Sequence, residues 1–370
     1  MQSMATSTKS SSIRKAQVTV SCFFCKGQEI KWTCVDCNVR MCNSCKITVH
    51  QGLQCSQDHD VISIQDIIQS SPSSQEVMSV VIASVFNSYT TTLPAVHTLL
   101  CSDDGLIYYT FCHIPSKGNQ FVKGKLFKSS IKILQTLKRN VFDIAINKDG
   151  EILMKEFDVS TIQIISHVGE VKTVLDTTPM ILLAIHVNKD NEVIVSLREQ
   201  GPPFPVQDFS VRQVIIFNSD YQRKFTLEFD KKGNKLFSYA LHIRTDSKNV
   251  VYVVDCFDRQ KNGRIVAVDR NGCIKFIYDG QNRLGTFKPY AITVTQSDNI
   301  VVADYSNDAL HVINSNGHLL GLQFICIDLG ITEPYSLCFD TEGYLLIGCG
   351  KAKHENYGKI HVAKITDSLM

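Results

Sequence analysis

Eight zinc-type ligands lie within 38 residues near the start of the chain, and this cluster constrains the fold more than any other feature. Three C-x-x-C pairs followed by two histidines make two complete tetrahedral ligand sets with no donor left over. Because both sets are closed, neither ion would keep a position for water, so both predicted zinc ions are structural. The ligands are Cys22, Cys25, Cys34, Cys37, Cys42, Cys45, His50 and His59.

The segment around these ligands contains little apolar sequence. Residues 20–62 hold too few apolar side chains to form a core unaided, and segments this short usually need metal or disulfides to fold. Bound zinc can contribute on the order of 10–16 kcal/mol of folding free energy. Three disulfides are the alternative, but the sequence shows no secretory signal peptide, which favours a reducing compartment.

The ligand order resembles that of a B-box zinc finger over about residues 20–62. Both histidines come last, whereas RING and PHD fingers place a histidine earlier and ZZ fingers place their two histidines closer together. The resemblance implies a cross-braced pairing, with Cys22, Cys25, Cys42 and Cys45 on one ion and Cys34, Cys37, His50 and His59 on the other. Sequential pairing stays open on the residues alone, and Cys55 could replace His59.

The remaining composition indicates a multidomain protein without a strong electrostatic bias. A chain of 370 residues suggests two or three domains, and 44% apolar residues are enough for a sizeable core. A net charge of +2 argues against a globally basic nucleic-acid binder. No apolar run approaches 18 residues, so no membrane partner is expected. The absence of a signal peptide predicts a cytoplasmic location, with the nucleus as the alternative.

A repeating unit occupies the long C-terminal part of the chain. A turn with Gly, Asn or Asp recurs at intervals of 45, 41, 58, 50 and 44 residues, and an apolar run follows each turn at once. Gly and Asn tolerate the positive φ of tight hairpin turns, and units of 40–50 residues with four short strands are typical of a β-propeller. The sequence therefore predicts a mainly β protein with a six-bladed propeller. The six turns are Asp104-Gly105, Asp149-Gly150, Asp190-Asn191, Lys248-Asn249, Asp298-Asn299 and Glu342-Gly343.

Two irregularities in the repeat lead to specific expectations. The interval of 58 residues predicts a long loop around Gly201–Pro205, where proline disfavours central-strand pairing. After the sixth turn only two strands fit before residue 370, so the last blade lacks its outer strand. Because closing the ring removes exposed sheet edges, the apolar segment 79–87 is predicted to complete that blade. A short helix over 77–88 is the alternative.

A second resemblance covers about residues 95–367. The run from Val302 to Ile313 looks like an NHL repeat, and Val253-Val254-Asp255 with Ile265–Val268 is a looser copy. A B-box followed by an NHL-like propeller is similar to the tripartite-motif (TRIM) proteins, although no RING ligand cluster and no sustained heptad pattern are found. The resemblance implies a protein-binding adaptor, an RNA-binding regulator, or a ubiquitin-ligase component that depends on a RING partner.

One basic cluster is a candidate for phosphate or RNA binding. No acidic residue lies between Gly105 and Phe142, and the same stretch holds seven cations. Basic clusters supply the sequence-independent part of nucleic-acid affinity, but a solvated outer blade face would have the same composition. The candidate residues are Lys123, Lys125, Lys128 and Lys132.

The sequence predicts no enzyme and no small-molecule substrate. It contains no nucleophile with a base at a recognisable spacing, no phosphate-cradling glycine loop and no open metal triad. Asp255 and Asp304, which follow second strands, could line a ligand face or accept backbone hydrogen bonds in their turns. A propeller hydrolase assembled from distant loops is the alternative. The expected organisation is a disordered segment 1–17, a B-box 18–63, a linker 64–78 and a propeller 79–370.

Overall fold

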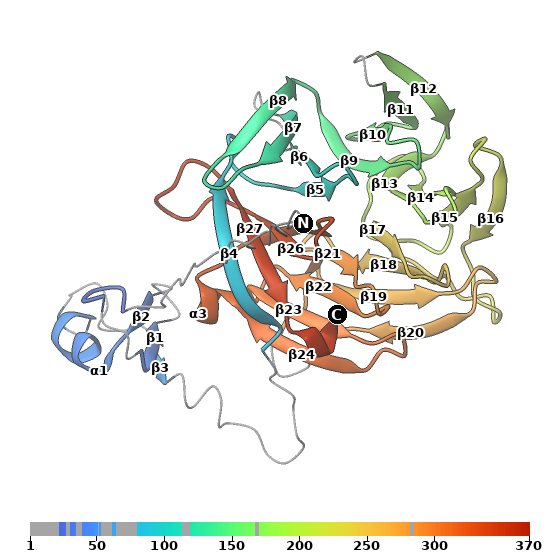
Figure 1. Ribbon diagram of the computed structural model, residues 1–370. Helices are drawn as coiled ribbons and strands as arrows, with labels where there is room; N and C mark the ends of the chain where they lie inside the picture. The colour runs from blue at the N-terminus through green and yellow to red at the C-terminus, as the bar shows by residue number, and fades with distance from the viewer. Residues whose placement is uncertain are drawn as a thin grey trace, which may run out of the picture.

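The computed structural model describes residues 22–26, 30–34, 39–50, 52, 61–63, 80–112, 119–166, 170–281 and 285–370. The predicted disordered segment 1–17 and the predicted linker 64–78 lie outside these residues. The described chain is mainly β, with a small N-terminal sheet and a large wheel of sheets (Figure 1). None of the helices in the described residues has the length and hydropathy needed to cross a bilayer.

Six four-stranded antiparallel sheets form the propeller, as predicted. Each of the first five blades uses four consecutive strands, in the order inner to outer. Blade 1 contains β5 (Thr98–Cys101), β6 (Leu106–Phe111), β7 (Gln120–Leu126) and β8 (Ile131–Leu137). Blade 2 contains β9 (Val141–Ile146), β10 (Ile152–Glu156), β11 (Thr161–Ile165) and β12 (Val171–Asp176). Blade 3 contains β13 (Ile181–Val187), β14 (Val193–Arg198), β15 (Arg212–Phe217) and β16 (Arg223–Leu227).

The other three blades repeat the same pattern with one change at the end. Blade 4 contains β17 (Ala240–Thr245), β18 (Val251–Cys256), β19 (Gly263–Val268) and β20 (Ile274–Tyr278). Blade 5 contains β21 (Pro289–Val294), β22 (Ile300–Asp304), β23 (Ala309–Ile313) and β24 (Leu319–Phe324), followed by the short helix α3 (Ile325–Leu329). Blade 6 contains β25 (Pro334–Phe339), β26 (Leu345–Cys349), β27 (Lys359–Ile365) and β4 (Ile82–Thr90), and a 3₁₀ turn, Asp367–Leu369, ends the chain.

The first turn of every blade has the backbone conformation that its sequence predicted. One residue in each turn has a φ between +61° and +84°. In blade 5 the left-handed residue is Asp298, not the Asn299 that follows it. This conformation is disfavoured for most side chains and tolerated by Gly, Asn and Asp, which explains why these residue types mark the repeat. The six residues are Gly105, Gly150, Asn191, Asn249, Asp298 and Gly343.

An early segment of the chain closes the ring. Strand β4 pairs antiparallel with β27, with Ser88 opposite His361 and Ile82 opposite Ile365. The segment predicted to complete the last blade is therefore a strand and not a helix. Val81, Ile82 and Val85 pack into the core of blades 5 and 6, which ties the front of the propeller to its end.

Apolar layers between neighbouring blades hold the wheel together. At the seam of blades 6 and 1, Leu99 and Tyr109 pack against Leu346 and Ile360. Similar layers lie between the other blades, because alternate side chains of each strand face the adjacent sheet. The predicted long loop occupies residues 199–211, between β14 and β15 of blade 3.

The N-terminal sheet is much smaller. It has the strand order β2-β1-β3, formed by β1 (Trp32–Cys34), β2 (Val39–Met41) and β3 (Val61–Ser63). A single turn of helix, α1 (Asn43–Cys45), continues into a π-helical turn, Lys46–His50. The buried hydrophobic cluster of this module consists of Cys22, Cys34, Met41 and Cys45, all of which contain sulfur, and His50 is buried as well.

Candidate functional site

Two chain turns bring four cysteines together at the N-terminal sheet. Cys22 and Cys25 lie on a tight turn closed by the hydrogen bond from Lys26 N to Cys22 O at 2.9 Å. Cys42 caps the N-terminus of α1 and Cys45 lies at its end. The β2 strand joins the two turns, because Phe23 N donates to Arg40 O at 2.9 Å, immediately before Met41 and Cys42.

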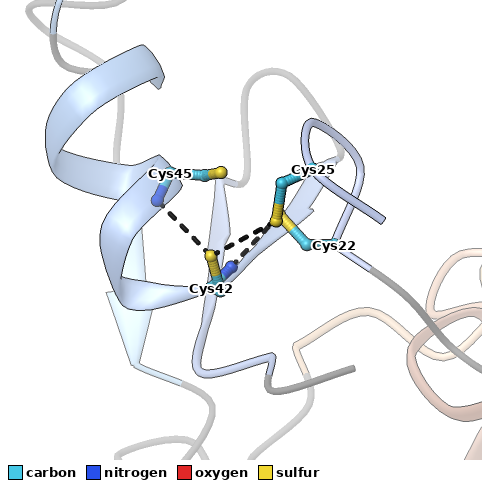
Figure 2. Close-up of side chains that lie close together, drawn as sticks. All are labelled: Cys22, Cys25, Cys42 and Cys45. Carbon is cyan, nitrogen blue, oxygen red and sulfur yellow. Dashed lines mark hydrogen bonds between the residues drawn. The ribbon is translucent and has the colours of Figure 1, made fainter. Parts of the chain in front are cut away.

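The geometry of the four thiols fits one tetrahedral metal ion. All four sulfur atoms lie within 4.8 Å of one another (Figure 2). The Sγ atoms of Cys25 and Cys42 are 3.7 Å apart. This separation is far longer than a disulfide bond, and it is close to the roughly 3.8 Å expected between two thiolates bound to one zinc at about 2.3 Å. A four-sulfur tetrahedral set favours zinc or iron–sulfur chemistry over hard cations.

Backbone donors at the cluster stabilise negative charge on sulfur. Cys42 N donates to the Sγ of Cys22 at 3.4 Å, and Cys45 N donates to the Sγ of Cys42 at 3.4 Å. Burial raises the pKa of the Cys22 thiol, but N–H donation from Cys25, Cys42 and Phe24 outweighs it and lowers the net pKa. Thiolate is the form that binds metal, so the local backbone favours the ligand state at Cys22, whereas burial raises the pKa of the Cys45 thiol to about 12.

The quartet joins the first and third C-x-x-C pairs, which is the first ligand set that the B-box resemblance implied. Of the second set, Cys34 and His50 are buried, with exposed fractions of 0% and 1%. Cys37 and His59 lie outside the described residues, as does Cys55. The second zinc site therefore stays a prediction.

An indole fixes the start of the helix that carries two of the cysteines. Trp32 Nε1 donates to the side-chain oxygen of Asn43 at 3.0 Å. The ammonium group of Lys46 lies 3.1 Å from the centre of the Trp32 ring, in a cation–π contact. These contacts link β1 to the Cys42–Cys45 turn.

The basic cluster lies on the two outer strands of blade 1. Lys125 on β7 is paired with Lys132 on β8, and both side chains are exposed, as is Lys128 in the turn between the strands. Lys123 is half-buried, with its ammonium group 5.7 Å from the centre of the Tyr108 ring. Three of the four predicted residues are therefore accessible on one blade edge.

Apolar and acidic groups accompany these lysines. Phe127, Ile133 and Leu134 expose 49%, 40% and 48% of their surface on the same edge. A cavity of about 500 Å³ lies between blades 1 and 6 and is lined by Lys125 and Lys128. Carboxylates from both blades line it too, namely Asp103, Asp104, Asp340 and Glu342.

Asp255 and Asp304 satisfy backbone donors and do not face a ligand site. Both are fully buried. Asp255 accepts from Ser238 N at 2.7 Å and Tyr239 N at 2.8 Å, and it pairs with Arg264 at 3.0 Å. Asp304 accepts from Lys288 N, directly before the neighbouring strand β21, at 3.2 Å and from Ser306 N in its own turn at 3.1 Å. Of the two roles that the sequence left open, the geometry supports acceptance of backbone hydrogen bonds by both aspartates.

Sequence reasoning missed a buried pair of charged groups in blade 2. Asp143 has 1% of its surface exposed and Lys155 has 2%. The carboxylate of Asp143 accepts from Ile144 N at 3.0 Å and from Ile185 N at 2.9 Å, which links blades 2 and 3. Burial raises the pKa of Asp143 to about 6, although the positive charge of Arg244 opposes the shift. A single charged residue inside an apolar strand has no periodic signature, so no sequence pattern pointed to either group.

Comparisons with known proteins support the propeller and nothing finer. No family model and no curated protein matches the chain. A gluconolactonase from Xanthomonas campestris superposes with a TM-score of 0.52 at 11% identity, over 74% of this chain and 88% of its own. Virginiamycin B lyase from Staphylococcus aureus has a TM-score of 0.50 at 13% identity, over 76% and 99%. The WD40 propeller domain of Doa1 has a TM-score of 0.50 at 11% identity, over 79% and 98%.

Two of these structures are different enzymes, a gluconolactonase and a lyase, and the third is a WD40 propeller domain, so their likeness to this chain establishes the fold alone. A propeller presents loops and blade edges on a rigid frame, which suggests a protein-interaction scaffold. The chain is therefore a six-bladed β-propeller protein with an N-terminal cluster of four cysteines that could hold one metal ion.

Proposed function

We propose that this protein is a zinc-binding adaptor of the tripartite-motif type, which binds a protein partner through its propeller and its metal module. The observation that carries the proposal is the outer edge of blade 1. There, three partly exposed apolar side chains lie beside three exposed lysines. Apolar groups surrounded by charged ones are typical of protein-binding surfaces. The partner would carry acidic and apolar side chains in one segment, in the cytoplasm or nucleus.

The metal module adds a second exposed apolar surface. Phe23 exposes 53% of its surface beside Cys22, and Ile47 exposes 57% in the turn that follows Cys45. Both residues are adjacent in sequence to the cysteine cluster, so bound zinc would fix their positions. A partner could contact this surface as well as blade 1, which would raise the overall affinity.

RNA binding is the second candidate, because three lysines lie together on one blade edge. Carboxylates from two blades line the adjoining cavity and would repel a phosphate backbone. A protein partner tolerates mixed charge better than RNA does. The role of a ubiquitin-ligase component rests on the family resemblance, and an in vitro ubiquitination assay tests it. If the purified protein formed ubiquitin chains without an added ligase, it would have ubiquitin-ligase activity of its own, which the proposal does not include.

Crosslinking of the full chain in cells, followed by identification of the bound species, tests the choice between protein and RNA. The test variant carries Lys125→Glu, Lys128→Glu and Lys132→Glu. The control carries Lys148→Glu, Lys172→Glu and Lys248→Glu, three exposed lysines on other blades, so both variants have the same net charge. We expect the test variant alone to lose a specific protein crosslink. Retention of that crosslink, or loss of RNA crosslinks only, would contradict the adaptor proposal.

A further inference from the structure

A second cavity opens on the opposite face of the propeller from the basic cluster. Its volume is about 300 Å³, at the lower end of the range of about 300–1,000 Å³ for small-molecule sites. Its walls come from blades 2, 3 and 4, at the ends where second strands finish and first strands begin. The groups that matter for recognition are Phe142, Lys155, Phe157, Asp158, Arg198 and Tyr239.

Lys155 supplies a buried positive charge to this cavity. Its ammonium nitrogen donates to Leu182 O at 2.7 Å and lies 4.5 Å from the centre of the Phe142 ring. Among the described residues it forms no ion pair within 4.0 Å. Burial lowers the pKa of Lys155 to about 8, so the group is mostly protonated at neutral pH. A buried ammonium group with one hydrogen bond of three is poorly solvated, and an anion would stabilise it.

Arg198 supplies a second buried cation with donor capacity to spare. It has 7% of its surface exposed. One terminal nitrogen donates to Glu199 O at 2.9 Å and to Gly201 O at 2.7 Å, and the other pairs with Asp158 at 2.9 Å. Its Nε atom is buried and has no hydrogen-bond partner in the described part of the chain. Buried N–H groups without partners are uncommon in proteins and point to a missing acceptor.

The loop over the cavity is held in place by arginines. Arg198 binds the carbonyl of Gly201, and Arg212 donates to the carbonyl of Pro203 at 2.8 Å. Arg212 is itself almost fully buried and paired with Glu199. The part of the cavity wall formed by Gly201 and Pro203 is therefore held by buried arginines, one of which also lines the cavity, and this favours a preformed site.

The charges and walls of the cavity select the kind of ligand. Lys155 and Arg198 contribute two positive charges and Asp158 one negative charge, so the lining carries a single net positive charge. Behind it, Asp143 interacts with both Arg244 and Lys155, whose positive charges oppose the rise in its pKa, so three cations are set against two carboxylates and the net charge is still one positive. A dianion would exceed the available charge. The rings of Phe142 and Phe157, packed edge to face at 5.6 Å, form an apolar wall.

From these observations we infer that the cavity binds a small monocarboxylate with an apolar or aromatic body, held by the two cationic side chains that line it, Lys155 and Arg198. The site is independent of the proposed partner surface on blade 1, which lies on the other face. The alternative is that Lys155 only braces Leu182 and Phe142 within the fold. That role would need no ligand and would not distinguish an acid from its amide.

Phenylacetate and its neutral isostere phenylacetamide test the inference on the full-length wild-type protein. Ligand-observed NMR titrations at pH 7 in a buffer without carboxylate or phosphate would measure both. We expect saturable binding of phenylacetate with a Kd of about 1–10 mM and at least about tenfold weaker binding of the amide. Inorganic phosphate should bind more weakly than phenylacetate. Equal binding of acid and amide, no saturation by the acid, or tighter binding of phosphate would overturn the assignment.

Two substitutions with opposite expected effects on the affinity for phenylacetate test where the site lies. Lys155→Met should weaken phenylacetate binding at least about tenfold, whereas Lys148→Met, an exposed lysine of the same blade, should not change it. Asp158→Asn should tighten binding about two- to fivefold, because it removes the negative charge. Asp158 has a φ of +56°, a conformation that asparagine tolerates, so this variant keeps its fold even where Lys155→Met does not. Unchanged or weaker binding by Asp158→Asn would contradict the proposal.

Discussion

The N-terminal module and the propeller reach a folded state by different means. The described module has three strands of three residues each and a core in which sulfur predominates. The propeller has six four-stranded sheets with continuous apolar layers between them. Because the first buries so little apolar surface, we propose that a metal ion held by the four cysteines supplies the stability that side-chain burial supplies in the second. We therefore expect the N-terminal module to depend on metal for its fold, whereas the propeller depends on closure of its ring.

The largest effect is expected when one cysteine ligand is removed from the N-terminal module, because only the module and not the propeller should then unfold. Cys45→Ser should locally unfold the described residues 22–26, 30–34 and 39–50, because metal coordination contributes on the order of 10 kcal/mol to such modules. Hydrogen exchange should show loss of amide protection there and full protection in the propeller strands. Cys273→Ser, which changes a half-buried thiol in blade 4, is the matched control and should leave both regions protected. If Cys45→Ser also unfolded the propeller, the proposed difference between the metal-dependent module and the propeller would be contradicted.

The next largest effect is expected from a substitution in β4 that destabilises the propeller but not the N-terminal module. Val85→Asp places a charge in the core that β4 completes, where Val85 has 8% of its surface exposed. We expect a loss of about 3–5 kcal/mol in the free energy of unfolding, measured by urea denaturation. Ala83→Asp, at an exposed position of the same strand, should cost no more than about 1 kcal/mol. Equal losses would mean that β4 does not hold the ring closed.

A third prediction concerns how the stability of the propeller depends on pH at the strand that closes the ring. His361 on β27 is within 2.7 Å of Ser88 Oγ on the closing strand, and burial lowers its pKa to about 4. The unfolded state takes up a proton near pH 6.5 while the folded state does not, so His361 makes the wild type lose stability as pH falls from 6.5 toward 4. The free energy of unfolding of the wild type relative to His361→Gln should fall by about 2 kcal/mol between pH 7 and pH 5. A constant difference would contradict the burial of this imidazole.

The smallest expected effect concerns one blade turn. Asn191 has a φ of +61°, and its side-chain oxygen accepts from Lys148 N of the previous blade at 3.0 Å. Asn191→Gly keeps the backbone conformation and loses only the hydrogen bond, at a cost of about 1 kcal/mol. Asn191→Ala also strains the turn and should cost about 1 kcal/mol more in thermal denaturation. A glycine variant less stable than the alanine variant would argue against the strained conformation.

The blades could be predicted because their turns are local. Each depends on a residue that tolerates positive φ between two apolar runs, and these features are visible in single letters of the sequence. A further local signal was missed. Asn147, Asn188, Asp246 and Asp340 each precede a turn and accept N–H groups two and four residues later. Such Asx turns could have placed the repeat more precisely.

The sites depend on contacts that no local pattern contains. Ligand spacing predicted metal binding, but the residues alone left the pairing of the cysteines open, since it depends on how two turns meet across β2. The monocarboxylate cavity joins Lys155 to Arg198, 43 residues later in the chain, through the packing of two blades. Neither residue stands in a motif, so only the three-dimensional arrangement brings them together.

We propose above all that a metal ion, held by Cys22, Cys25, Cys42 and Cys45, folds the N-terminal module. Native mass spectrometry of the freshly purified full chain, combined with elemental analysis, measures it most directly. The account predicts at least one zinc per chain, and two if the second ligand set is also filled, with loss of amide protection at residues 22–50 after chelation. Protein without bound metal whose module keeps its protection in the presence of a chelator would contradict it.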